Sequence, residues 1–124
     1  MLKNIFGRVR PNFYDGTNLW QSFPFQGQYD FLSFPSGHAT TAASIAAIAY
    51  LFVPKISPIF VLFAIWIAIT RLGVGAHYPA DVIAGLFVGA CFTWIYARSF
   101  ARKRLLFCFD KGGKLILRKP YGFR

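Results

Sequence analysis

Acidic residues are scarce in this chain of 124 residues, where four Asp and Glu face fourteen Lys and Arg, for a formal net charge of +10. Charged residues of both signs make up only 15% of the sequence, whereas hydrophobic residues make up 56%. This hydrophobicity excludes a disordered polar chain. It also disfavours an ordinary soluble domain, in which about a quarter of the residues are charged. The composition therefore indicates a membrane protein first, and nucleic-acid binding is the second interpretation of the positive charge.

Cysteine is also scarce, with only Cys91 and Cys108 in the sequence. Two cysteines are too few for the disulfide framework of a small secreted protein. Cys91 lies in an apolar stretch and Cys108 lies in a basic tail. We therefore expect two free thiols without an assigned role.

Long apolar stretches without a charge occur three times, at residues 39–54, 56–70 and 82–97. Each has 15 or 16 residues, fewer than the 20 or so that cross a bilayer. Because the stretches are apolar on all sides, they differ from amphipathic helices of soluble proteins. They predict an all-α fold, a membrane helical bundle with three transmembrane helices. The alternative is three buried helices of a soluble bundle.

Basic residues predict the orientation of these helices. Nine Lys and Arg and one acid, Asp110, follow residue 97, which places this tail in the cytoplasm by the positive-inside rule. We therefore divide the chain into a domain at 1–97 and a basic cytoplasmic tail at 98–124. With three spans, Lys55 also lies inside. The segments around His38 and around 71–81 then lie together on the outer face of the membrane.

Two further segments allow more than one interpretation. Residues 12–34 interleave aromatic with polar residues, which is typical of a loop at the membrane interface. This loop could guide a lipid tail or simply anchor the chain. In the tail, residues 105–109 and 114–118 flank a glycine turn and resemble a β-hairpin. A lone hairpin is marginal in water, so a partly ordered tail on anionic lipid is an equal alternative.

Cations gather at the predicted outer ends of the helices, where they need an anion to offset their mutual repulsion. Arg10 and Arg71 can bind a phosphate with planar guanidinium groups, and Lys3 can add a point charge. Ser36 and Gly37 open the first helix, so their backbone N–H groups also favour an anion. These residues predict a phosphate-binding site.

Two histidines near this site have different neighbours. His77 and Asp81 are four residues apart around the start of the third helix, so their side chains can meet. A carboxylate on one ring nitrogen leaves the other available as a nucleophile. His38 has no acid nearby in the sequence and can protonate a leaving oxygen. Taken singly, each feature is also common in structural positions, and the combination is what indicates catalysis.

The combination has a known counterpart. In order and spacing, three groups of residues resemble the three motifs of the type 2 phosphatidic acid phosphatase superfamily. They are Lys3 with Arg10-Pro11, then Pro35 to His38, then Arg71 with His77 and Asp81. One departure is Thr70, where members of the family usually have Ser before the Arg of the third motif. The hydroxyl group is kept at this position.

The resemblance implies a role for each residue. His77 would attack phosphorus and form a phosphohistidine, Asp81 would orient it, and His38 would protonate the leaving group. The phosphate and its transition state would be held by Lys3, Arg10, Ser36, Gly37 and Arg71. The family's phosphatases need no metal, so we expect no cofactor. Members in membranes usually have six spanning helices, and this chain is expected to correspond to the C-terminal half of such a core.

These observations predict an integral-membrane lipid phosphate phosphatase, in a bacterial inner membrane with the site on the periplasmic or outer face. Candidate substrates are phosphatidate, phosphatidylglycerol phosphate, undecaprenyl diphosphate and lipid A, and membrane lipids are the expected partners. The alternatives are a truncated, non-catalytic fragment that binds anionic lipid and a soluble phosphatase or haloperoxidase. Nucleic-acid binding is disfavoured, because the basic residues gather in the tail without a stacking platform. The sequence does not predict an oligomeric state.

Overall fold

The computed structural model describes residues 5–20, 29–103, 105, 107–113 and 115–117. Two short 3-10 turns, η1 (Pro11–Phe13) and η2 (Tyr29–Phe31), precede the helices α2 (Gly37–Phe52), α3 (Ser57–Gly73) and α4 (Pro79–Arg102). The strands β1 (Phe107–Phe109) and β2 (Leu115–Leu117) follow them. The fold is therefore mostly helical, as predicted. The prediction of an all-α fold is wrong for the tail, where these strands form a small sheet.

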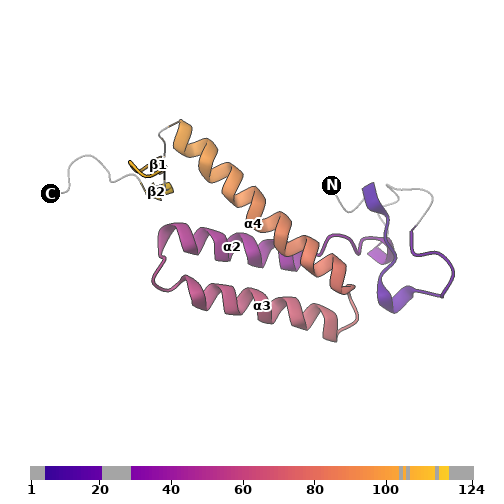
Figure 1. Cartoon of the computed structure of the whole chain (residues 1–124). Coiled ribbons are helices and arrows are strands. Elements are labelled where there is room, and N and C mark those ends of the chain that lie inside the picture. Colours follow the sequence, from indigo (N-terminus) through magenta and orange to yellow (C-terminus); the bar gives the residue numbers. More distant parts are fainter. Residues whose placement is uncertain (1–4, 21–28, 104, 106, 114, 118–124) are drawn as a thin grey trace.

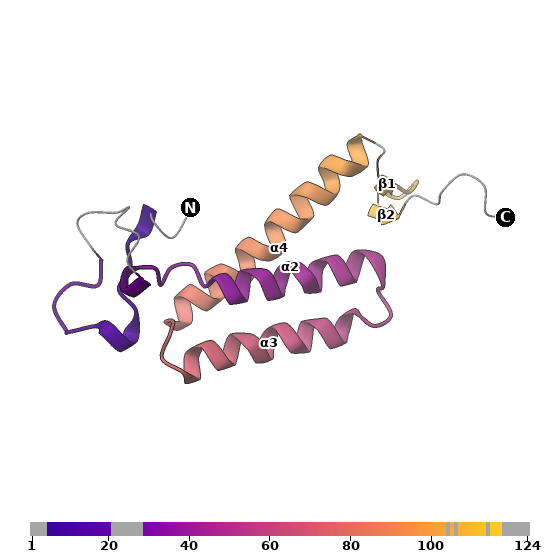
Figure 2. The same ribbon diagram turned by 180° about the vertical axis from the view of Figure 1, so that it is seen from behind.

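Helix α2 lies at the centre of the bundle. It runs antiparallel to α3, and α4 crosses it at an angle on the other side (Figures 1 and 2). Both outer helices pack against α2, whereas α3 and α4 have little contact with each other. The start of α2, the end of α3 and the start of α4 lie at one end of the bundle. The hairpin lies at the opposite end, as the predicted topology requires.

Small residues form the interface between α2 and α4. The buried residues of α2 include five alanines, and Gly85 and Gly89 are buried on α4. A Cβ atom added to Gly89 would lie 2.2 Å from the backbone oxygen of Thr40, and one added to Gly85 would lie 2.5 Å from that of Ser36. The two backbones are thus in direct contact, which is the packing that small residues permit between membrane helices.

Large apolar side chains lie on the outer surface of the bundle. Ile59, Leu62, Ile83 and Phe87 are each 67% exposed, so the large residues face outward while alanine and glycine face inward. Among the described helices, α4 has 24 residues and a mean hydropathy of 1.6, enough to cross a membrane. Helices α2 and α3 are also apolar but have only 16 and 17 residues. The structure therefore supports one membrane span by length, whereas three were predicted.

The helix boundaries follow the glycines and prolines of the sequence. Ser36 is the N-cap of α2, α3 ends at Gly73, and Pro79 occupies the first position of α4, where its missing N–H costs no hydrogen bond. The position of Ser36 confirms the prediction that Ser36 and Gly37 open the first helix. Helix α4 continues to Arg102, five residues beyond the predicted end of the apolar stretch.

The tail forms a β-hairpin, one of the two alternatives that the sequence allowed for it. Phe107 pairs with Leu117 and Phe109 with Leu115 in an antiparallel register. Phe107 and Leu115 are buried with Ala97 and Ala101 of α4. Packing on a helix supplies the stability that an isolated hairpin lacks. Residues 104, 106, 114 and 118–124 of the predicted tail lie outside the described residues.

Cys91 and Cys108 are both free thiols, which confirms that prediction. The described part of the segment before α2 is held by backbone hydrogen bonds. Val9 N–H donates to Leu19 at 3.0 Å and Arg10 N–H donates to Asp30 at 2.8 Å. Of the predicted interfacial loop, residues 21–28 lie outside the described part of the chain, and its position at a membrane interface stays a prediction.

Candidate active site

The polar residues of the predicted site gather at the end of the bundle where α2 and α4 begin. The backbone N–H of Ser36, which caps α2, donates to the carbonyl oxygen of Asp81 in the first turn of α4 at 2.9 Å. The segment before α2 lies across this end (Figure 1). The predicted juxtaposition of the second and third motifs is therefore confirmed, although 45 residues separate Ser36 from Asp81 in the sequence.

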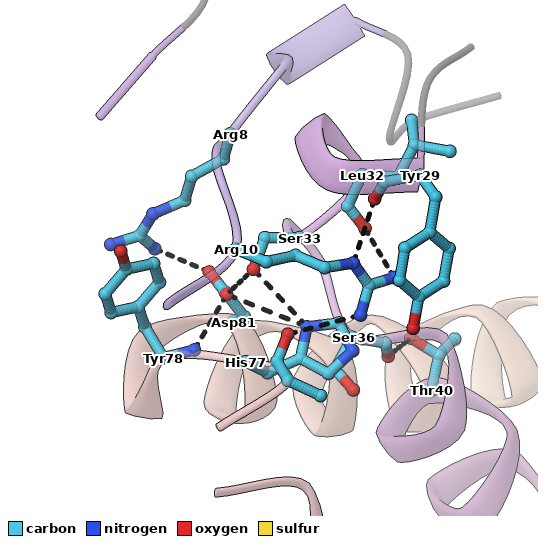
Figure 3. A network of polar contacts seen from close by, with 11 residues as sticks. Arg8, Arg10, Tyr29, Leu32, Ser33, Ser36, Thr40, His77, Tyr78 and Asp81 are labelled. Atoms are coloured by element: carbon cyan, nitrogen blue, oxygen red, sulfur yellow. Dashed lines mark hydrogen bonds and ion pairs between the residues drawn. The ribbon is translucent and has the colours of Figure 1, made fainter. Parts of the chain in front are cut away.

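Asp81 is the centre of the cluster and is completely buried. Its Oδ1 accepts from the guanidinium of Arg8, and its Oδ2 accepts from the hydroxyl of Ser33 and from the backbone N–H of Tyr78, the latter at 3.0 Å (Figure 3). The Tyr78 bond also caps the first turn of α4. Three donors, one of them charged, favour the ionised carboxylate in a place where an unpaired charge would be costly.

His77 lies beside this carboxylate and is only 4% exposed. Its Nδ1 lies 3.8 Å from Asp81 Oδ2 and 3.5 Å from Ser33 Oγ. The spacing of four residues therefore brings the two side chains together, as predicted. Since Nδ1 is directed at Ser33 and Asp81 (Figure 3), Nε2 is the nitrogen that can meet a substrate.

Arg10 is also buried, with 6% exposure, and its guanidinium holds three loop segments together. Nε donates to the carbonyl of Tyr29 at 2.9 Å, Nη1 to that of Ala76 at 3.2 Å and Nη2 to that of Leu32 at 3.4 Å. Its Cζ also stacks over the Tyr29 ring, 3.9 Å from the centroid. A guanidinium has five N–H donors, so one on each terminal nitrogen is left over for an anion.

Ser36 and Gly37 begin α2 next to this guanidinium. Ser36 is completely buried, and its hydroxyl has no hydrogen-bond partner among the residues that the structure describes. Its carbonyl accepts from both the backbone and the hydroxyl of Thr40. The first N–H groups of a helix have no acceptor within it. This end of α2 can therefore bind an anion.

The other predicted residues lie elsewhere. His38 is exposed and lines a cavity of about 390 Å³ between α2 and α3, together with Phe60 and Phe63. Arg71 is half-buried near the end of α3, with Nε and Nη2 each 3.4 Å from the hydroxyl of Thr70. Lys3 lies outside the described residues. The structure thus brings His77, Asp81, Ser36 and Arg10 together, with His38 and Arg71 on the α3 side.

Sequence reasoning missed Arg8, Ser33 and Tyr78. Ser33 and Arg8 lie 48 and 73 residues from their partner Asp81, too far for a spacing argument. One available signal was a lone serine between Leu32 and Phe34, three residues before the N-cap of a helix. The Arg8 guanidinium also lies over the Tyr78 ring, 4.4 Å from its centroid. Burial raises the pKa of the Tyr78 hydroxyl, which has no hydrogen-bond partner within the described part.

Among the described residues, no group of three His, Cys, Asp or Glu side chains is placed to hold a metal ion. The chemistry that this site can perform through its own side chains is nucleophilic attack by an imidazole, with cations and a helix N-terminus to hold an anion.

Known proteins with similar sequences include lipid phosphatases, as the motifs predict. The chain is 46% identical over 107 residues to the lipid A 1-phosphatase of Rhizobium johnstonii, covering 86% of this chain and 44% of that protein. It is 35% identical over 95 residues to the undecaprenyl-diphosphatase of Sulfolobus acidocaldarius, covering 75% and 42%. A lipid A 4'-phosphatase of Bacteroides thetaiotaomicron is 30% identical over 98 residues, covering 77% and 44%.

The chain thus spans less than half the length of these curated relatives. No solved structure matches it significantly. The sequence pattern of the PAP2 superfamily, the type 2 phosphatidic acid phosphatases, matches residues 1–105. This match covers the three motifs and all three helices, and the chain therefore belongs to the PAP2 superfamily.

Proposed function

We propose that this chain carries the phosphate-transfer centre of a membrane lipid phosphatase that acts on a phosphate monoester of the lipid A 1-phosphate type. The observation that carries the proposal is the buried cluster of His77, Ser33 and Asp81 beside the guanidinium of Arg10. In this cluster the imidazole is held with Nδ1 toward a carboxylate. The helix N-terminus next to it can bind the phosphate.

Phosphate binding involves groups from three segments. The unused N–H groups of Arg10 and the backbone N–H groups at the start of α2 provide the buried half of the site. Arg71 and Lys3 provide further positive charge from the α3 side and the first motif. Their combined charge offsets the negative charge that builds up on the phosphoryl oxygens in the transition state.

The first step is attack by His77. The lone pair on Nε2 forms a bond to phosphorus while the bond from phosphorus to the lipid oxygen breaks. His38, protonated, gives its proton to that oxygen, and the dephosphorylated lipid leaves. Asp81 keeps its negative charge and stabilises the positive charge that forms on His77 when Nε2 bonds to phosphorus.

The second step restores the enzyme. Water attacks the phosphohistidine, and His38, now neutral, accepts the proton that the water loses. The bond between phosphorus and Nε2 breaks, inorganic phosphate leaves, and His77 returns to its starting form. His38 ends the cycle protonated, as it began.

Lipid A 1-phosphate is the first candidate substrate, because two relatives named lipid A 1-phosphatase are 46% and 44% identical to this chain. Undecaprenyl diphosphate is the second, because the relative from Sulfolobus acidocaldarius that is named undecaprenyl-diphosphatase is 35% identical. The apolar outer surface of the helices and the length of α4 support a site held at a membrane surface. We place that site on the periplasmic face of a bacterial inner membrane, with the basic tail in the cytoplasm.

The test is phosphate release by the purified chain in detergent. Lipid A 1-phosphate, undecaprenyl diphosphate, phosphatidate and phosphatidylglycerol phosphate are offered in turn, with His77→Ala and His77→Gln as the inactive variants. We expect release from the wild type, fastest with lipid A 1-phosphate, and none from either variant. Equal release from wild type and variants would contradict the proposal.

The alternative, a non-catalytic fragment that binds anionic lipid, predicts a different pair of results. Such a fragment would bind vesicles that contain phosphatidylglycerol, and it would release no phosphate from any of the four lipids. His77→Gln would then leave binding unchanged. The assay and the vesicle measurement together separate the two functions.

A further inference from the structure

Ser33 lies at the point where the imidazole and the carboxylate meet. It is completely buried, three residues before the N-cap of α2, and its backbone N–H donates to the carbonyl of Arg8 at 3.1 Å. Its hydroxyl contacts both Asp81 Oδ2 and His77 Nδ1 (Figure 3). Ser33 belongs to none of the three motifs on which the resemblance was based.

The protons in this cluster can be placed by elimination. An ionised carboxylate only accepts, so the single proton of the Ser33 hydroxyl is directed at Asp81 Oδ2. Ser33 Oγ therefore has no proton to give to His77 and can only accept at the 3.5 Å contact with Nδ1. The proton of that contact must be carried by Nδ1, and when the imidazole is neutral Nε2 then has none.

Asp81 alone holds this arrangement weakly. His77 Nδ1 lies 3.8 Å from Asp81 Oδ2, beyond the length of a hydrogen bond between nitrogen and oxygen. Oδ2 also accepts from the backbone of Tyr78, and Oδ1 is paired with Arg8. Ser33 is thus the nearer acceptor for Nδ1–H, and it relays the effect of the carboxylate to the ring.

We propose that Ser33 is a positioning residue that fixes His77 as the tautomer protonated on Nδ1, the form whose Nε2 lone pair is directed at the phosphate. The consequence for catalysis rests on the proposed function, whereas the tautomer itself does not. Loss of the hydroxyl leaves Nδ1 with only the distant Asp81 oxygen. The tautomer protonated on Nε2, which cannot attack phosphorus, then becomes populated.

The test is ¹⁵N NMR of the histidine rings in detergent micelles, at a pH at which the imidazoles are neutral. The chain has only two histidines, so the spectrum of a His38→Gln variant assigns the signals of His77. We expect the wild type to show a protonated Nδ1 and an unprotonated Nε2. In Ser33→Ala the signal of protonated Nδ1 should fall and that of protonated Nε2 should appear.

Ser44→Ala is the matched control. Its hydroxyl also makes a hydrogen bond between elements, to the carbonyl of Gly89 at 3.2 Å, but further along α2. We expect it to leave the tautomer of His77 unchanged. Ser33→Cys keeps the unbranched shape of the side chain with a slightly larger atom and offers a weaker hydrogen bond, so an intermediate tautomer ratio is expected. This variant also covers the case in which Ser33→Ala fails to fold.

Activity provides the second measurement. A histidine held in the wrong tautomer costs about 10⁴ in kcat in the serine protease triad, so Ser33→Ala should lower kcat by at least about tenfold and leave KM nearly unchanged. An unchanged tautomer in both Ser33 variants would overturn the proposal, whatever their activity. A wild type that releases no phosphate but shows the expected tautomer shift would overturn the proposed function and leave the role of Ser33 standing.

Discussion

The two interfaces of α2 differ in how closely the helices approach. At the α2–α4 interface, Gly85 and Gly89 bring the backbones into contact, and a Cβ atom at Gly89 would collide with the carbonyl of Thr40 at 2.2 Å. At the α2–α3 interface apolar side chains also pack together, but a cavity of about 390 Å³ lies beside them. The site divides in the same way. His77, Asp81 and Ser36 are buried at the first interface, whereas His38 and Arg71 are more exposed beside the second.

This difference indicates which part of the site is positioned by the packing of the helices. Backbone contact between α2 and α4 holds the nucleophile, its carboxylate and the helix N-terminus in fixed relation. An attacking atom needs such precision, because small displacements are costly in rate. On the α3 side, His38 lines a cavity of about 390 Å³ and is exposed. Variants at the two interfaces should therefore differ in their effects on stability and on phosphate release.

Asp81→Asn should have the largest effect. The substitution removes the buried charge that pairs with Arg8 and accepts from Ser33, and breaking a buried ion pair costs about 3–5 kcal/mol. Chemical unfolding in detergent should show this loss of stability. Arg71→Gln, on the α3 side, is the comparison and should change the free energy of unfolding by less than about 1 kcal/mol. Equal losses would remove the distinction between the interfaces.

A larger side chain on α2 should be tolerated only beside the cavity. Ala39 is completely buried against Gly85, so Ala39→Leu should destabilise the bundle by about 3 kcal/mol through overpacking. Ala42 lines the cavity, and Ala42→Leu should cost less than about 1 kcal/mol because the added atoms enter empty space. Thermal unfolding of both variants measures the difference. A larger loss in Ala42→Leu would contradict the account.

Glycine substitutions should give the smallest change in the free energy of unfolding, and they compare two positions that differ in what a methyl group would contact. Gly89→Ala places a methyl group against the backbone of Thr40, whereas Gly73→Ala meets nothing within 4 Å. We expect the first to cost about 1–3 kcal/mol and the second to be nearly neutral. Phosphate release should fall with the first variant alone, because the separation of α2 from α4 also displaces His77 from Ser36. Equal activity in both would show that the site does not depend on this contact.

Much of the fold could be predicted because its determinants are local. Apolar stretches bounded by Ser36, Gly73 and Pro79 give the helices and their ends. The hairpin could not be decided, because its stability comes from Phe107 and Leu115 packing on α4, a contact that no spacing reveals. The number of spans stays a prediction, because α2 and α3 are apolar but shorter than α4, which among the described helices is the one long enough to cross a membrane.

The site also could be predicted only where its contacts are local in the sequence. The spacing of His77 and Asp81 predicts their contact, because His77 lies two residues before α4 and Asp81 lies in the first turn of that helix. Arg8 and Ser33 were missed because they reach Asp81 from a segment whose path depends on the whole bundle. The commitment of Arg10 to three carbonyls was also unexpected, since the sequence suggested a guanidinium devoted to phosphate. Long-range hydrogen bonds, rather than local pattern, complete the polar cluster.

The central claim is that His77, fixed at the α2–α4 interface, is the group that attacks phosphorus. The most direct test is to mix the chain with ³²P-labelled lipid A 1-phosphate, quench with base, and locate the label by mass spectrometry of peptides. We predict an acid-labile phosphoramidate on His77, absent from His77→Gln. Label on His38, or release of phosphate without any labelled histidine, would contradict the claim.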